Sequence, residues 1–237
     1  MAIIRVIDLE TTGLSPPAGV CELAFVDVRN DGSGWRVWTG DSELVNPGMP
    51  IPPEASAIHH LIDEDVEDAT IWRVISNRIP VSFEDDGDRP MALAAHNAKF
   101  ERQWVDDGIA GGLPWICTYK VALRVWPEAP SHGNQVLRYW LKPAGLVRDY
   151  AQPAHRAMPD AYTTAFILRE ALDRGVAVDD MIAWTAEPAK LPTCPIGKWR
   201  GMPWAEVDAG FLRWMLGKDF DEDVLHCAFT ELERRKS

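Results

Sequence analysis

The sequence predicts a mixed α/β domain followed by a small α+β module. Three observations favour this class. Strand patterns come first and then alternate with helical patterns. The 237 residues, 46% of them hydrophobic, suit one packed domain with a small appendage. Three prolines fall within residues 188–195, a composition typical of a linker. We therefore expect a domain over residues 1–185, a linker over 186–195 and a module over 196–237.

Three strands are expected to open the chain. Residues 3–9, 21–28 and 36–45 have strand patterns, and turn signals stand at Asn30-Asp31-Gly32 and Asn46-Pro47-Gly48. We expect these strands to form an antiparallel meander.

Helices and one further strand follow. Periodicity predicts helices over 53–61, 70–79, 98–107, 118–125, 135–141 and 159–174. The acidic stretch 84–88 is expected to be a surface loop, and the apolar run 91–95 to return to the sheet. In the module, two short strands about the basic turn 197–203 are expected before helices over 209–216 and 222–235.

Composition argues against several classes of protein. No apolar run approaches the ~20 residues that span a bilayer, and Arg5 and Asp8 interrupt any secretory segment, so we expect a cytoplasmic protein with no membrane partner. The cysteines are scattered and form no Cys-x-x-Cys pair, which predicts neither a zinc site nor a disulfide framework. They are Cys21, Cys117, Cys194 and Cys227.

The net charge of -12 is unevenly distributed along the chain. Residues 1–185 hold 16 Lys and Arg against 27 Asp and Glu, whereas residues 186–237 hold 8 against 9. The acidic excess therefore lies on the first domain, where bound cations would offset part of it.

Two carboxylates stand at the end of the first strand. Because side chains alternate across a strand, Asp8 and Glu10 project from one face with Cα atoms ~6.6 Å apart. This spacing suits shared divalent cations. The alternative is that both acids simply face water.

Two later segments add carboxylates and a base. In residues 95–101 a strand leads into a helix whose first turn holds Glu101, and Asp160 begins another helix five residues after His155. Helix N-termini favour anions, so both acids also suit an ordinary role there, and His155 suits a surface or capping role.

Taken in order, these segments resemble the three exonuclease motifs of the DEDDh superfamily, which includes proofreading exonucleases and ribonuclease T. The similarity is closer to the exodeoxyribonuclease X family and covers nearly the whole chain. Further matching segments are Ala57-Ile58-His59-His60-Leu61, Trp115-Ile116-Cys117-Thr118, Trp126-Pro127 and Ile196-Gly197-Lys198-Trp199-Arg200-Gly201.

The resemblance implies a ribonuclease H-like exonuclease fold and removal of nucleotides from DNA 3′ ends as 5′-monophosphates. It also implies two Mg²⁺ or Mn²⁺ ions, which stabilise the attacking and leaving oxygens and suit oxygen ligands. By the family pattern, Asp8 would bridge both ions. Glu10 and Asp160 would complete the site of the first ion, and Glu101 would serve the second. His155 would be the general base.

The chain departs from the family pattern at Glu101, where an aspartate is usual. The extra methylene moves the carboxylate oxygens outward and adds a rotatable bond. We expect altered rather than abolished activity.

Substrate contacts are expected at Thr11, Thr12 and Leu14, near the terminal nucleotide, and at His59 and Asn97, near the sugar or phosphate. Alternatively, Leu14 belongs to the core and Thr12 caps a turn.

In the module, the basic turn with Trp199 suits single-stranded nucleic acid, or it serves packing or dimerisation.

Three functions account for the motifs. The first is a 3′-5′ exonuclease acting on single-stranded or duplex DNA ends. The second is an RNA-trimming exonuclease of the same fold, and the third is a noncatalytic nucleic-acid-binding scaffold. The sequence leaves open whether the chain is a monomer or a homodimer.

Overall fold

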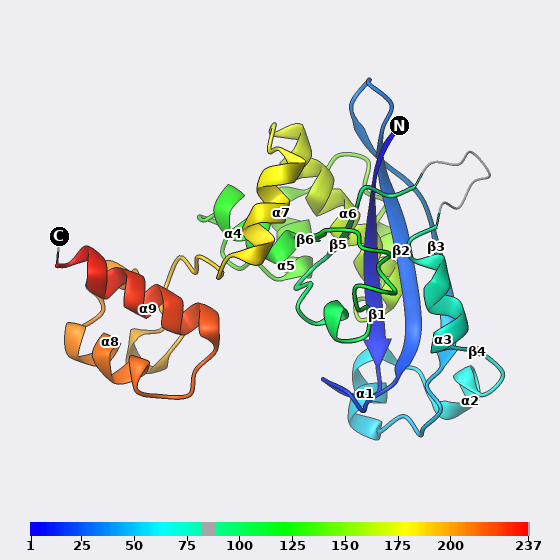
Figure 1. Ribbon diagram of the computed structural model, residues 1–237, viewed down its shortest axis with the longest axis horizontal. Helices are drawn as coiled ribbons and strands as arrows, with labels where there is room; N and C mark the ends of the chain where they lie inside the picture. The colour runs from blue at the N-terminus through cyan, green and yellow to red at the C-terminus, as the bar shows by residue number, and fades with distance from the viewer. Residues whose placement is uncertain (82–88, 237) are drawn as a thin grey trace.

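The computed structural model describes residues 1–81 and 89–236, so the predicted acidic loop at 84–88 lies outside the described residues. Its centre is a six-stranded mixed sheet in the order β4-β3-β2-β1-β5-β6. Figure 1 shows the long strands at the centre of the larger domain, with the C-terminal helices set to one side and joined to it by the segment after α7.

The predicted antiparallel meander is confirmed. It consists of β1 (Ala2–Thr11), β2 (Val20–Asn30) and β3 (Trp35–Asn46). β5 (Ala92–Ala95) returns parallel to β1, as expected for residues 91–95. The sequence did not predict β6 (Trp115–Cys117), a three-residue strand too short to show periodicity.

The helices cover both faces of the sheet, and most agree with their predicted ranges. The well-predicted ones are α1 (Pro53–His59), α4 (Thr118–Val125), α5 (Asn134–Leu141) and α6 (Ala157–Asp173). α2 (Asp63–Val66) and α7 (Val178–Ala186) were not predicted. Among the described residues, no helix combines the length and apolar character that crossing a membrane would need.

Helix α6 lies against the meander and brings the third motif to the first strand. Ala157, Ala161 and Ala165 are fully buried in one core cluster with Ile4 and Val6 of β1. Small side chains let the helix approach the sheet closely. Because residues two apart share a strand face, Asp8 and Glu10 continue the row of Ile4 and Val6 toward α6.

Two predicted helices are largely wrong. Residues 70–79 form β4 (Thr70–Ile71), the one-turn α3 (Trp72–Ile75) and a 3₁₀ turn, η1 (Ser76–Arg78). Residues 98–107 contain only the 3₁₀ turn η2 (Glu101–Gln103). In this second segment Ala98, Glu101, Trp104 and Val105 are buried, a spacing that also suits an α-helical face, so the pattern alone could not exclude a helix.

The module contains the predicted helices α8 (Ala209–Leu216) and α9 (Glu222–Arg234). The two strands expected at 197–203 are wrong. That segment holds the 3₁₀ turn η4 (Gly197–Trp199) and one isolated bridge between Thr193 and Pro203. Pro203 has no N–H to donate, so the bridge cannot extend into a ladder through it.

The module has its own core of Cys194, Trp204, Leu212, Met215, Val224 and Cys227. Leu191 packs against this core and Cys194 belongs to it, so residues of the linker predicted at 186–195 contact the module. Two further 3₁₀ turns are η3 (Arg148–Ala151), before α6, and η5 (Trp204–Glu206), in the module. The division at 185 and 196 stays a prediction.

Candidate active site

Three of the predicted carboxylates meet between β1 and α6. Carboxylate oxygens of Asp8, Glu10 and Asp160 all lie within 4.8 Å of one another. Strand alternation accounts for Asp8 and Glu10, and the packing of α6 on the sheet brings in Asp160 from its first turn. Oxygen ligands at this separation can hold a metal ion.

Asp160 is held by groups on both of its oxygens. The backbone N–H of His155 donates to one oxygen at 2.8 Å, and the side-chain amide of Gln135 on α5 donates to the other at 2.7 Å. His155 is exposed and has a left-handed backbone, with φ 61°. Its peptide group therefore orients Asp160, while its ring is left to face solvent beside the carboxylates.

An ion pair between the buried Glu22 and the partly exposed Arg156 anchors the segment that carries His155. Glu22, which pairs with Glu10 across β1 and β2, is 4% exposed. Arg156 donates to its two oxygens at 2.9 and 2.7 Å, and the backbone N–H of Ala157 donates at 3.0 Å. Bidentate geometry fixes orientation as well as charge. The pair thus ties the start of α6 to β2.

Sequence reasoning missed Glu22, Arg156 and Gln135. A carboxylate inside the otherwise apolar segment Val20-Cys21-Glu22-Leu23-Ala24 was a usable signal, because buried acids are rarely left without a partner. No local pattern pointed to Gln135.

Glu101 lies in η2 and is 3% exposed. Within the described part of the chain, its Oε2 atom is buried and has no hydrogen-bond partner. It is not one of the three clustered carboxylates, but its charge is among those that raise the pKa of Asp8. A buried carboxylate oxygen without a donor is a suitable ligand for a second cation near Asp8.

The carboxylates repel one another in a partly dehydrated space. Burial, followed by the charges of Glu10, Asp160 and Glu101, raises the pKa of Asp8 well above its usual value. Burial, with the charges of Asp160 and Glu22, raises the pKa of Glu10 to about 8. Burial also raises the pKa of Glu101 to about 8 and that of Asp160 above its usual value. A divalent cation favours the ionised forms of all four, so the residues fit a metal centre.

Metal-free protein should lose stability as pH rises from about 4.5 toward about 8, because Glu10 and Glu101 have pKa values of about 8 when folded. A raised folded pKa means that the folded state holds protons which the unfolded state releases over this range. Glu101→Gln should flatten this loss and raise Tm at pH 9 in chelator by ~2–4 °C or more, equivalent to ~1 kcal/mol for a chain of this size. Saturating Mg²⁺ should reduce the pH dependence of the original protein.

Calorimetry between pH 5.5 and 9, in chelator and in Mg²⁺, measures this effect. The control is Glu206→Gln, which neutralises an exposed carboxylate of the module. Equal pH dependence in Glu101→Gln and in the original protein would contradict the electrostatic account.

The structure separates the predicted substrate contacts into two groups. Thr11, Thr12 and His59 are buried. Thr12 exchanges two 2.9 Å hydrogen bonds with Gly19, one through its hydroxyl, which is the turn-capping role. The ring of His59 accepts from the N–H of Leu61 at 3.1 Å, and burial lowers its pKa.

The other group is exposed. Leu14 is 84% exposed, so the core alternative for it is wrong. Its carbonyl accepts from the amide of Gln103 in η2 at 3.3 Å. Asn97 is exposed with a left-handed φ of 77° and lines a groove with Lys99.

The chain is similar to several known proteins in sequence and in fold. No family model matches the chain. The chain is 34% identical over 219 residues to Exodeoxyribonuclease 10 of Escherichia coli (strain K12), and the alignment covers 90% of both proteins. The solved structure of Exonuclease X in complex with 5′ overhanging duplex DNA is similar, with a TM-score of 0.61 and 32% identity. That match covers 77% of this chain and 99% of the other.

The nuclease domain of 3′hExo, a DEDDh family member bound to rAMP, shares the fold with a TM-score of 0.55 at 16% identity. The match covers 73% of this chain and 92% of that nuclease domain. The fold and the relatives agree with the motifs that the sequence presents. The chain therefore belongs to the exodeoxyribonuclease X family, and it is a 3′-5′ exonuclease with a ribonuclease H-like fold, which the DEDDh family member shares.

Proposed function

We propose that this exonuclease degrades DNA from its 3′ end and releases nucleoside 5′-monophosphates with the help of two divalent ions, Mg²⁺ or Mn²⁺. The observation that carries the metal dependence is the cluster of Asp8, Glu10 and Asp160, whose oxygens lie within 4.8 Å of one another. DNA is the favoured substrate because the relative with 90% coverage is an exodeoxyribonuclease and the similar structure is a complex with duplex DNA.

Asp8, Glu10 and Asp160 would hold one ion, and Asp8 and Glu101 the other. Such ions supply positive charge that stabilises the attacking and departing oxygens of the phosphodiester.

The chain's own residues would orient the strand end and move a proton. His155 would accept the proton of the attacking water at its imidazole, and the backbone contact with Asp160 keeps the ring beside the carboxylates. Leu14 would contact the terminal base, because it is an exposed apolar side chain next to η2. Asn97 would contact the sugar or phosphate. Thr11, Thr12 and His59 would hold in place the protein backbone that surrounds that nucleotide.

We also propose the division of labour along the chain. Residues 1–185 form the exonuclease domain, since they contain every residue assigned to the reaction. Residues 186–195 link it to a separate module over 196–237.

A substrate assay tests the proposal. Single-stranded DNA, duplex DNA and RNA, each labelled at the 5′ end, are incubated with Mg²⁺, Mn²⁺ or chelator. We expect DNA to shorten stepwise from the 3′ end only with metal and to yield 5′-monophosphates. Circular single-stranded DNA, which has no 3′ end, is the control and should stay intact.

Each other outcome has a definite meaning. Shortening of RNA alone would assign the chain to RNA trimming. Cleavage of the circle would reveal an endonuclease, and binding without cleavage of any substrate would indicate a noncatalytic scaffold. DNA degradation in chelator would contradict the metal dependence.

A further inference from the structure

The C-terminal module carries four aromatic side chains that the proposed reaction does not use. Their rings form a continuous series: Trp199 and Phe211 are 6.4 Å apart, Phe211 and Trp214 5.1 Å, and Trp214 and Phe220 5.8 Å. They come from η4, from α8 and from the turn before α9, so only the folded module assembles them. We call these four residues the aromatic strip.

The strip is anchored on the module core but is not enclosed by it. Trp199, Phe211 and Phe220 are half-buried and pack against that core. Trp214 remains 47% exposed, although Trp204 of the same module is buried to 9% exposure. Keeping part of a large aromatic side chain in water forgoes hydrophobic stabilisation. Because the exposed ring continues into three partly exposed ones, the rings form one contiguous surface, which is typical of a binding site.

Unpaired cations accompany the strip. The ammonium of Lys198 lies 5.2 Å from the centre of the Trp199 ring, and that of Lys218 lies 5.7 Å from the centre of the Trp214 ring. Arg200 and Arg213 are also exposed on these elements. Across residues 1–81 and 89–236, no ion pair involves any of these four cations.

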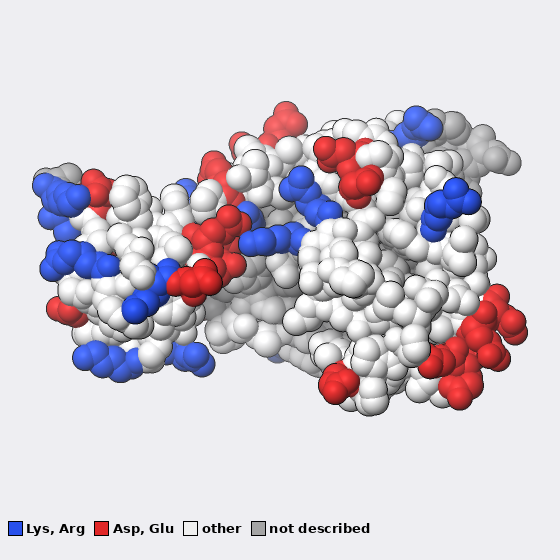
Figure 2. Space-filling model, turned by 60° about the horizontal axis from the view of Figure 1, so that its bottom comes forward, with Lys and Arg blue, Asp and Glu red and all other residues white. Residues whose placement is uncertain are grey.

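The strip thus differs in charge from the rest of the protein. Residues 197–220, which contain all four rings of the strip, hold four Lys and Arg and three Asp and Glu, in a chain whose net charge is -12. By contrast, Arg235 and Lys236 at the end of the module pair with Glu231 and Glu233. Figure 2 shows basic side chains spread over the module and acidic ones where it meets the larger domain. The four cations beside the strip are therefore available to a polyanion.

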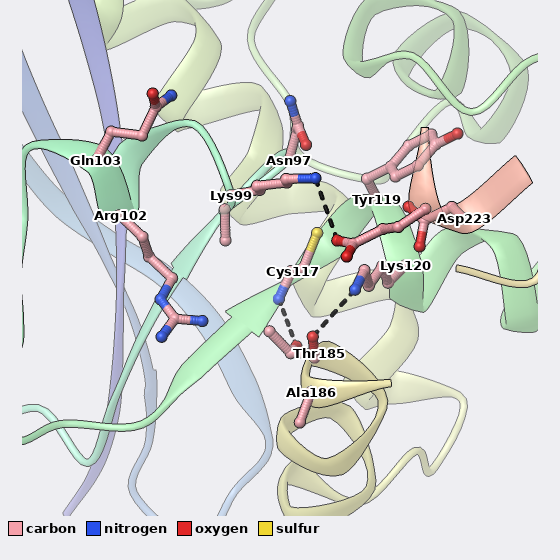
Figure 3. A pocket seen from close by; sticks show the side chains of 12 residues that line it. Asn97, Lys99, Arg102, Gln103, Cys117, Tyr119, Lys120, Thr185, Ala186 and Asp223 are labelled. Atoms are coloured by element: carbon pink, nitrogen blue, oxygen red, sulfur yellow. Dashed lines mark hydrogen bonds and ion pairs between the residues drawn. The ribbon is translucent and has the colours of Figure 1, made fainter. Parts of the chain in front are cut away.

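The strip ends next to the exonuclease domain. Phe220 directly precedes Asp221 and Glu222, whose carboxylates lie 3.7 and 3.1 Å from the ammonium of Lys99. Lys99 stands two residues before Glu101. A groove of about 400 Å³ opens here, lined by Asn97, Lys99, Arg102, Lys120, Glu222 and Asp223 among others. Figure 3 shows Lys99 reaching across this groove toward the start of α9.

We propose that the aromatic strip binds the single strand that continues on the 5′ side of the nucleotide held in the active site. This inference rests on the proposed DNA exonuclease function. Every base has a flat face, so stacking on aromatic rings tolerates any sequence, and neighbouring Lys and Arg contact the phosphates. An exonuclease that removes successive nucleotides requires such sequence-independent contacts. The unpaired cations favour a nucleic-acid strand over a second protein chain as the occupant.

The test replaces Trp214 with alanine in the full chain and compares long and short substrates. Oligothymidylates of about 20 and about 4 nucleotides are used, since one single-strand site spans roughly 4–16 nucleotides. We expect KM for the long substrate to rise about 5- to 100-fold, the factor that the loss of one stacked base produces. The kcat values and the KM for the short substrate should stay unchanged, and Trp214→Phe should keep most of the affinity.

Phe229→Ala is the matched control, because Phe229 is a 53% exposed aromatic residue of the same module that lies outside the strip. It should leave both substrates unaffected. Equal changes for long and short substrates in Trp214→Ala, or no change for either, would overturn the proposal.

A binding measurement keeps this test separate from the proposed catalysis. Fluorescence anisotropy of a labelled oligothymidylate of about 20 nucleotides is recorded in chelator, where no turnover is needed. Weaker binding by Trp214→Ala supports the strip even if the original protein proves inactive, and unchanged binding refutes it. Sedimentation tests whether a second copy of the chain covers the strip instead. If the original protein is a dimer, and Trp214→Ala is a monomer that still binds the strand, the strip is a dimer interface.

Discussion

Replacing Asp8 with asparagine should reduce kcat by on the order of 10³-fold or more, because metal ions supply several kcal/mol of charge stabilisation and each 1.4 kcal/mol changes a rate tenfold. Asp8 interacts with each of the other three carboxylates. The charges of Glu10, Asp160 and Glu101 all raise its pKa. Asparagine keeps the shape but removes the charge that would be shared between the ions.

The measurement combines single-turnover hydrolysis of labelled DNA with titration calorimetry of Mn²⁺. We expect weaker metal binding and near-normal DNA binding in chelator. Tm in chelator near pH 7 should rise, because the amide removes a partly buried carboxylate whose ionisation the folded state opposes. Glu128→Gln, which neutralises an exposed carboxylate of the same domain, should change none of these. Activity of Asp8→Asn within tenfold of the original would exclude Asp8 as a shared ligand.

Replacing His155 with alanine should reduce kcat by about 10²- to 10⁴-fold, the usual contribution of a general base, while KM changes little. The ring is exposed, and Asp160 is held by the peptide N–H of this residue and not by the imidazole. Alanine therefore removes the base and keeps that hydrogen bond. Steady-state kinetics on single-stranded DNA measures the effect.

The backbone at this position calls for a second variant. His155 has a φ of 61°, which alanine tolerates less well than asparagine does. His155→Asn should lose activity to the same extent as His155→Ala, and added imidazole should restore part of the rate in both. Full activity in His155→Asn with loss only in His155→Ala would show a conformational role and not a proton-accepting one.

The glutamate at position 101 has a structural context that its sequence position did not reveal. We predicted it in the first turn of an α-helix, where its carboxylate would face a helix terminus. It lies instead in a 3₁₀ turn, is 3% exposed and has one oxygen that no described donor reaches. Its charge raises the pKa of Asp8, and altered rather than abolished activity stays a prediction.

Local patterns were sufficient for much of the fold. The predicted helices at 118–125 and 209–216 agree with α4 and α8 at both ends. The meander was predicted because alternation and turn residues are properties of neighbouring positions. Where the sequence failed, at 70–79 and 98–107, packing of a few buried residues outweighed weak helical propensity.

By itself, the sequence determined the order of the motifs and the shared face of Asp8 and Glu10, since a strand repeats every two residues whatever surrounds it. Tertiary structure alone decided which groups complete the site. The pair of Glu22 with Arg156 joins residues 134 positions apart, and Gln135 reaches Asp160 from another helix. Such contacts depend on how α5 and α6 pack on the sheet, a long-range outcome that no local period encodes. The same holds for the aromatic strip, whose rings meet only when η4, α8 and the turn before α9 fold together.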